Sequence, residues 1–262
     1  MRRFNPTATS VSDGASGCRP SAVGSPPFHR ARGIAAAIAV AACVTSTTSA
    51  AGRAVNFAAS DGTQLSATLY DSSNRQAPAV VLVHMLGRSR DDWDNVATRL
   101  ADAGLIVLAM DLRGHGRSSG VASMLPPMID DVRAAIAWID GRPNVTPGGI
   151  AIAGASLGAN LAALAAAESS QVRAVALLSP SLDYRGVRID AGVGKRIGAR
   201  PMWLAASTED PYALRTLKEL ASPAGPREQH LSRAPAHGTN LLAADADLAR
   251  SLVDWLKRTL IF

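Results

Sequence analysis

Cysteine, aromatic residues and paired histidines are scarce in this chain of 262 residues, and the shortages exclude whole classes of site. Both cysteines, Cys18 and Cys43, lie in the first 50 residues, so residues 51–262 hold neither a disulfide scaffold nor a cysteine-ligated metal. No two of the five histidines form a His-x-x-x-His pair. We therefore expect neither a metal nor another cofactor. The low aromatic content of 4%, in a chain dominated by alanine, is typical of a GC-rich bacterial gene.

The chain carries a net charge of +6, but the excess of basic residues is local. Residues 1–50 contain five arginines and one aspartate, a net +4, which leaves only +2 for residues 51–262. A nucleic-acid-binding domain typically carries a patch of basic residues on its folded surface, and residues 51–262 have little basic excess to form one. We therefore expect no nucleic-acid partner.

The first 50 residues have the composition of an export leader. Residues 5–30 are rich in Pro, Ser, Gly and Thr, which favours disorder. Arg30-Ala31-Arg32 then precedes an apolar segment at 33–42, which gives a basic n-region and an h-region too short to span a membrane. We expect an exported protein, periplasmic or secreted, with one domain over residues 51–262. A disordered extension from a misassigned start is the alternative.

Two processing sites compete at the end of this leader. Val40-Ala41-Ala42-Cys43 resembles a bacterial lipobox, in which Cys43 would carry a lipid that anchors the protein to a membrane. Thr48-Ser49-Ala50 before Ala51 is typical of an ordinary signal-peptidase site. The sequence favours neither site.

The strongest motif in the rest of the chain is Gly154-Ala155-Ser156-Leu157-Gly158. It follows a short apolar run at 149–153 and precedes an Ala-rich segment with leucines at 157, 161 and 164, the spacing of a helix. A Gly-x-Ser-x-Gly turn between a strand and a helix is the context of a nucleophile elbow. The dipole and unpaired N–H groups of the helix N-terminus favour a developing negative charge there.

Strand and helix patterns alternate along residues 54–256. Alternating apolar residues predict a hairpin at 54–70, and apolar runs predict strands at 79–83, 105–110, 149–153, 172–178, 201–206 and 228–231. Helical spacing predicts helices from Asp91 or Asp92 to Gly104 and at 128–139, 157–164, 212–220 and 241–256. Residues 181–200 are predicted to form only a short connector. This order predicts an α/β fold with a mostly parallel sheet and helices on both faces.

Five polar residues follow the ends of predicted strands: His84, Asp111, Ser156, Ser179 and Asp210. In sheets of this kind, ligands bind beyond the carboxyl ends of the strands. We therefore expect these residues to share one edge of the sheet and to form an organised site.

An acid and a base follow Ser156 in the order expected of a catalytic triad. Asp210 comes after a predicted strand, and His237 lies in a loop before the last helix. Histidine can take the proton of a serine hydroxyl and return it to the leaving group, while a carboxylate fixes the tautomer of the ring. Glu209 is the main competitor for the acid and Asp183 a weaker one. A helix N-terminal role for Asp210 and a solvated loop position for His237 are the structural alternatives.

These motifs, together with His84-Met85-Leu86-Gly87 and the segment 111–118, resemble the α/β-hydrolase fold superfamily over residues 54–262. The subgroup most similar to them contains small serine esterases and dienelactone-hydrolase-like proteins with little or no cap. A typical dienelactone hydrolase has a cysteine nucleophile, where this chain has Ser156. The resemblance implies a triad of Ser156, Asp210 and His237, with an oxyanion hole formed by the backbone N–H groups of Met85 and Leu157.

The other histidines and the arginines of these motifs have structural interpretations. We expect His84 to order the oxyanion loop, His115 to brace turns and His230 to be half exposed. For the arginines, we expect side chains that are solvated or that brace loops. The alternative is that they line the site and bind an acidic substrate. These arginines are Arg88, Arg90, Arg113 and Arg117.

The resemblance implies a serine hydrolase that cleaves the ester of a small acyl group through an acyl-enzyme. Residues 181–200 are too few to form a large lid over the site. We expect the binding partner of the protein to be its substrate, a small-molecule acyl compound. A peptidase or thioesterase with the same triad is one alternative. A hydrolase-fold protein that binds without catalysis is another.

Overall fold

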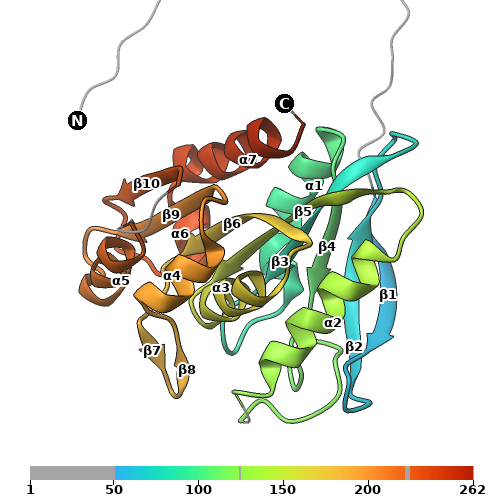
Figure 1. Ribbon diagram of the computed structural model, residues 1–262, viewed down its shortest axis with the longest axis horizontal. Helices are drawn as coiled ribbons and strands as arrows, with labels where there is room; N and C mark the ends of the chain where they lie inside the picture. Colours follow the sequence, from blue (N-terminus) through green and yellow to red (C-terminus); the bar gives the residue numbers. More distant parts are fainter. Residues whose placement is uncertain (1–50, 124, 222–224, 262) are drawn as a thin grey trace, which may run out of the picture. The chain divides into compact units, whose positions relative to one another are not determined.

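The computed structural model describes residues 51–123, 125–221 and 225–261; the predicted leader, with Cys18 and Cys43, lies outside them. Its main sheet has eight strands in the order β1-β2-β4-β3-β5-β6-β9-β10 (Figure 1). β1 (Arg53–Ala58) and β2 (Gln64–Tyr70) form the predicted antiparallel hairpin, and β2 also pairs antiparallel with β4. The other pairs of this sheet are parallel, which confirms the predicted α/β fold.

The parallel strands are buried because helices cover both faces of the sheet. Along β3, Val81 and Val83 pack into one core, whereas Val80 and Leu82 pack into the other, as the alternation of side chains along a strand requires. The parallel strands are β3 (Ala77–Val83), β4 (Ile106–Met110), β5 (Val145–Ala155), β6 (Val172–Leu178), β9 (Met202–Ser207) and β10 (Arg227–Ser232).

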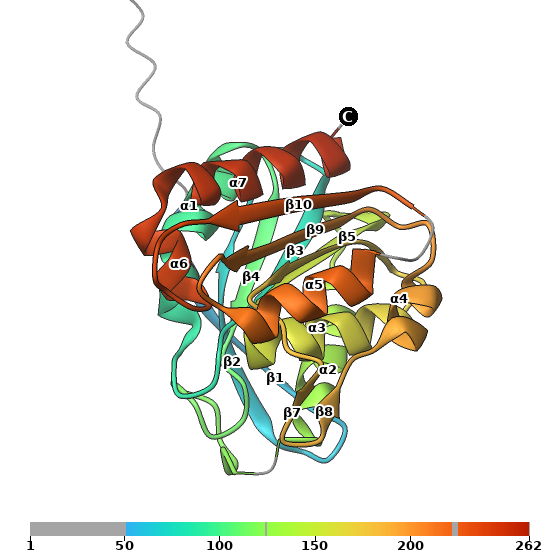
Figure 2. The same cartoon turned by 90° about the vertical axis from the view of Figure 1, so that its left-hand side faces the viewer.

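Two sets of helices fill these two cores, one on each side of the sheet (Figure 2). The first set is α2 (Met128–Asp140), α3 (Leu157–Glu168), α4 (Ala191–Ile197) and α5 (Pro211–Ala221). The second set is the 3₁₀ helix η1 (Arg90–Trp93), α1 (Asp94–Asp102), α6 (Thr239–Ala244) and α7 (Ala246–Ile261). None of the helices in the described ranges is long and apolar enough to cross a membrane.

Two sequence predictions were wrong in detail. Residues 181–200 are more than a connector, since they form a small hairpin of β7 (Asp183–Tyr184) and β8 (Val187–Arg188) and then α4. Elements this short carry too few residues to show a period. The single helix predicted at 241–256 is two helices, because the Asp245 carboxylate accepts the N–H of Leu248 at 2.9 Å and begins α7 there.

Candidate active site

Ser156 lies in a strained turn between β5 and α3. Its φ of 52° and ψ of −119° are values that residues with a side chain rarely adopt. The neighbouring glycines are required by close contacts. A Cβ at Gly154 would collide with the carbonyl of Gly158, and a Cβ at Gly158 would collide with the carbonyls of Val83 and His84. The turn therefore packs directly against the chain that leaves β3.

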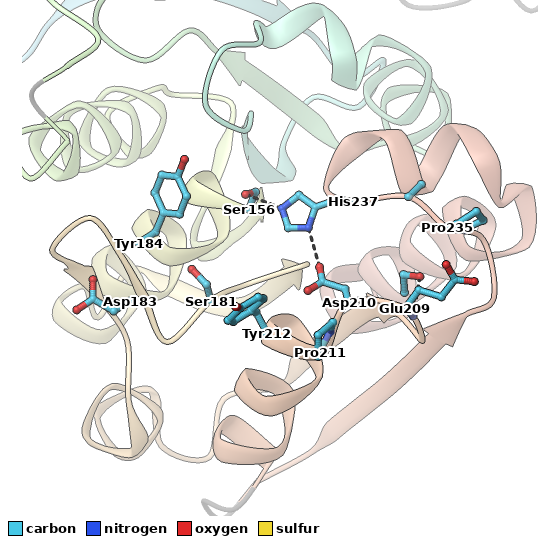
Figure 3. Close-up of a pocket in the computed structure, with 12 residues that line it drawn as sticks. Ser156, Ser181, Asp183, Tyr184, Glu209, Asp210, Pro211, Tyr212, Pro235 and His237 are labelled. Carbon is cyan, nitrogen blue, oxygen red and sulfur yellow. Dashed lines mark hydrogen bonds and ion pairs between the residues drawn. The ribbon is translucent and has the colours of Figure 1, made fainter.

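The structure brings together the three residues that the sequence suggests as a triad. Nε2 of His237 lies 2.8 Å from Oγ of Ser156, and Nδ1 of the same ring lies 2.7 Å from Oδ2 of Asp210 (Figure 3). A carboxylate only accepts hydrogen bonds, so the ring proton belongs on Nδ1 and Nε2 can accept the serine proton. This is the geometry of a nucleophile, a base and a group that orients the base.

Asp210 combines the two roles that its sequence context suggests. Oδ1 accepts the N–H of Ala213 at 3.0 Å and caps α5, while Oδ2 binds His237. The helix cap thus fixes the carboxylate that orients the ring. Glu209 and Asp183 line the same pocket, but the Nδ1 hydrogen bond of His237 goes to Asp210.

The two predicted oxyanion donors come from the elbow itself and from the loop that follows β3. Leu157 is the first residue of α3, where a backbone N–H has no carbonyl of a preceding helical turn to bind. Met85 follows β3 in the loop that Gly158 contacts, and its side chain packs against Gly238, next to His237.

Two buried histidines hold this loop against the segment 111–115. Nε2 of His84 accepts the N–H of Leu112 at 3.0 Å, and Nε2 of His115 accepts the N–H of Gly87 at 3.1 Å. An acceptor at Nε2 places the ring proton on Nδ1, which in each ring lies within 2.9 Å of a backbone carbonyl. These hydrogen bonds support the interpretation that His84 orders the oxyanion loop and that His115 braces turns.

This brace makes the stability of the fold depend on pH. Burial lowers the pKa of His84 to about 4 from the ordinary 6.5, although its hydrogen bond to Met85 acts in the opposite direction. The unfolded chain therefore binds a proton at a higher pH than the folded chain does. The stabilisation is complete above pH 6.5 and is lost as the pH falls towards 4.

We expect the free energy of unfolding to fall by about 2 kcal/mol between pH 7 and pH 5 because of His84 alone. His84→Gln has no titrating ring and should lose that much less over the same interval. Urea unfolding of both proteins at the two pH values measures the difference. Equal losses in the two proteins would assign the pH dependence to other groups.

None of the four motif arginines lines the pocket, and three of them pair with a carboxylate. Arg90 and Arg113 are buried and bind Asp111 and Asp131, at 2.9 and 2.6 Å. Arg88 is half exposed and binds Asp92, while Arg117 is exposed. Recognition of an acidic substrate by these arginines therefore has no support.

His230 is partly exposed, as predicted, and stacks on Trp203.

The candidate site opens into a pocket of about 610 Å³. One wall comes from the connector, with Ser181 and Tyr184, and another from the start of α5, with Pro211 and Tyr212 (Figure 3). Nowhere in the described ranges do three or more His, Cys, Asp or Glu side chains gather as a metal site.

Asn160 fixes the connector wall, a role that was not predicted from the sequence. Its buried amide donates to the carbonyls of Ser181 and Val187, at 2.7 and 2.8 Å, and accepts the N–H of Ser181 at 3.0 Å. The available signal was a single amide in a helix otherwise made almost wholly of Ala and Leu, because a buried amide must find partners.

Comparisons with known proteins agree with this architecture. Residues 74–223 match the family described as serine aminopeptidase, S33. The chain is 35% identical over 113 residues to an uncharacterized protein of Mycobacterium tuberculosis, over 43% of this chain and 40% of that protein. It is 31% identical over 134 residues to a polyketide transferase of Stachybotrys chlorohalonatus, over 50% of this chain and 45% of that protein. The matches thus span about half or less of these curated relatives.

Solved structures share the fold at lower identity. An esterase of Pyrococcus furiosus superposes with a TM-score of 0.67 and 18% identity, over 80% of this chain and 93% of the esterase. A dienelactone hydrolase of Anabaena variabilis gives a TM-score of 0.66 and 19% identity, over 80% and 98%. Identities this low establish the fold and not the substrate.

Proposed function

The chain belongs to the serine aminopeptidase S33 family of α/β hydrolases, and from this we propose that it is a serine hydrolase with Ser156, Asp210 and His237 as its triad. Family and fold support a hydrolase, and the activity, the triad and the substrate are our proposal. The observation that carries the proposal is the position of His237, whose two ring nitrogens lie within hydrogen-bond distance of Ser156 and Asp210.

The mechanism follows from the hydrogen bonds of His237. Nε2 takes the proton of the Ser156 hydroxyl while Oγ attacks the carbonyl carbon of the substrate. The oxyanion that forms accepts hydrogen bonds from the backbone N–H groups of Met85 and Leu157. The carbonyl then re-forms, the bond to the leaving group breaks, and His237 gives its proton to that group. Water, deprotonated by His237, releases the acid and restores Ser156 by the same steps.

The proposed substrate is the ester of a small acyl group. The pocket beside Ser156 is bounded by the short hairpin of β7 and β8 and by the start of α5, and the described part of the chain contains no large lid that would enclose a long substrate. Esterases share the fold. The family description supports a second candidate, an aminopeptidase that cleaves aminoacyl amides with the same triad.

An active-site probe and a substrate panel test these proposals in turn. A fluorophosphonate probe should label Ser156 in the folded protein and lose that reaction after denaturation. We expect short p-nitrophenyl esters to give the highest kcat/KM among esters, thioesters and aminoacyl p-nitroanilides. Absence of labelling at Ser156 would contradict the enzyme proposal, while a preference for anilides would favour the aminopeptidase.

We also propose that the protein is exported, which rests on the basic and apolar segments at 30–42. The mass of the mature N-terminus tests this. A lipid-modified Cys43 would indicate a membrane anchor, an N-terminus at Ala51 a periplasmic or secreted protein, and an intact leader would contradict export.

A further inference from the structure

Packing alone does not hold the His237 side chain in place. It lies in the loop between β10 and α6, and 51% of its side chain is exposed to solvent. Packing therefore restrains the ring only weakly. The hydrogen bonds to Ser156 and Asp210 can form only when the loop backbone places the ring within reach of both residues. The position of the ring depends on what holds the backbone at residues 237–239.

Ser179 holds the first of two backbone anchor points. Its Oγ accepts the N–H of Gly238 at 3.1 Å, directly after His237 in the chain. Ser179 is buried, and its own N–H donates to the carbonyl of Ala205 in β9 at 2.7 Å, so it is fixed to the sheet. Its φ of 50° is unfavourable for a residue with a side chain, which shows that the surrounding chain imposes this conformation.

Asp92 holds the second anchor point. The hydroxyl of Thr239 donates to Oδ2 of Asp92 at 2.5 Å, a contact between residues 147 positions apart. Arg88 binds the same carboxylate at 2.7 Å. Partial burial acts to raise the pKa of Asp92, but hydrogen bonds from Arg88 and Thr239 hold it below its usual range, so the carboxylate stays charged.

The same loop is pressed against the oxyanion loop. Gly238 has a φ of 59°, and a Cβ there would collide with the sulfur of Met85. The N–H of Arg88 donates to the carbonyl of Met85 at 3.2 Å, so the second anchor is also tied to the oxyanion loop. The peptide after His237 is therefore located relative to both the sheet and the predicted oxyanion donor.

We propose that Ser179 and the Asp92–Thr239 pair are positioning residues, which hold the backbone at Gly238 and Thr239 so that His237 meets Ser156. The inference rests on the proposed function, because it assigns a role in the same reaction. Two hydrogen bonds on consecutive residues fix both the place and the direction of the peptide. A displacement of the base by about 1 Å can cost about 100-fold in rate.

Two substitutions of Ser179 separate positioning from stability. Ser179→Ala and Ser179→Gly both remove the hydroxyl, but glycine also relieves the unfavourable φ and should melt at a higher temperature than alanine. We expect both variants to lose about 10- to 100-fold in kcat on a p-nitrophenyl ester, with KM changed less than about twofold. Fluorophosphonate labelling of Ser156 should slow by the same factor. If Ser179→Gly regains activity together with stability, Ser179 acts through stability alone and its role is overturned.

Thr239 offers a matched pair at the second anchor. Thr239→Val keeps the shape of the buried side chain and removes the hydroxyl, whereas Thr239→Ser keeps the hydroxyl. We expect Thr239→Val to lower kcat by about 10-fold. Thr239→Ser should keep a kcat close to that of the unmodified protein. Equal activity of the two variants would overturn the role of this hydrogen bond.

His237→Ala distinguishes failure of this inference from failure of the proposed function. If His237→Ala abolishes turnover but Ser179→Ala and Thr239→Val retain the kcat of the unmodified protein, only the positioning roles are wrong. If His237→Ala is itself as active as the unmodified protein, the triad proposal fails and the positioning roles fail with it.

Discussion

Ser156→Ala is expected to lower kcat by about 10⁴-fold or more on whichever acyl substrate the protein prefers. Without Oγ no acyl-enzyme can form, and His237 has no hydroxyl to deprotonate. The substitution removes one atom from a partly exposed side chain and leaves Gly154 and Gly158 in place, so the melting temperature should stay close to that of the unmodified protein. Hydrolysis of a short p-nitrophenyl ester measures the loss.

Ser170→Ala is the matched control for this experiment. Ser170 is exposed and lies just beyond the far end of α3, the helix that Ser156 begins. Its replacement makes the same chemical change beyond the opposite end of the same helix and should leave kcat unchanged. Retention of more than a few per cent of activity by Ser156→Ala would rule out Ser156 as the nucleophile.

What could be predicted from the sequence was mainly local. The elbow was readable because its glycines, serine and flanking elements are contiguous, and the buried strands were readable because each is a continuous apolar run. Asp210 and His237 are distant in the chain, but each is marked by its place after a strand or before a helix. The resemblance to α/β hydrolases then supplied their roles, which no local pattern contains.

What could not be predicted depends on contacts between distant segments. Ser179 was recognisable as a residue at a strand end, but its partner is Gly238, 59 positions away. Thr239 meets Asp92 across 147 positions, and neither residue stands out by type. The hairpin of β7 and β8 escaped prediction because each of its strands has two residues. Side-chain hydrogen bonds of this kind have no period, so they become visible only when the fold brings their partners together.

The largest expected effect on stability comes from a buried ion pair beneath the loop that follows β4. Asp131 in α2 is completely buried and binds the guanidinium of Arg113 through Nη2 at 2.6 Å and Nε at 2.9 Å. It also accepts the N–H of Arg113 at 2.9 Å. Hydrogen bonds with Asp131 raise the pKa of Arg113, which keeps the guanidinium charged. The pair fixes Arg113 near the start of this loop, and His115, two residues further on, braces the oxyanion loop.

Asp131→Ala is expected to lower the free energy of unfolding by about 3–5 kcal/mol, because it leaves a buried guanidinium without its main partner. Asp61→Ala is the matched control, since Asp61 binds the same guanidinium at 2.7 Å but is half exposed, and water can replace it. We expect its effect to be much smaller. Urea unfolding at pH 7 compares the two variants. Equal losses would mean that burial of the Arg113–Asp131 pair is not what makes it important for stability. A loss confined to Asp131→Ala, with slower hydrolysis in the fraction that folds, would connect this pair through His115 to the oxyanion loop.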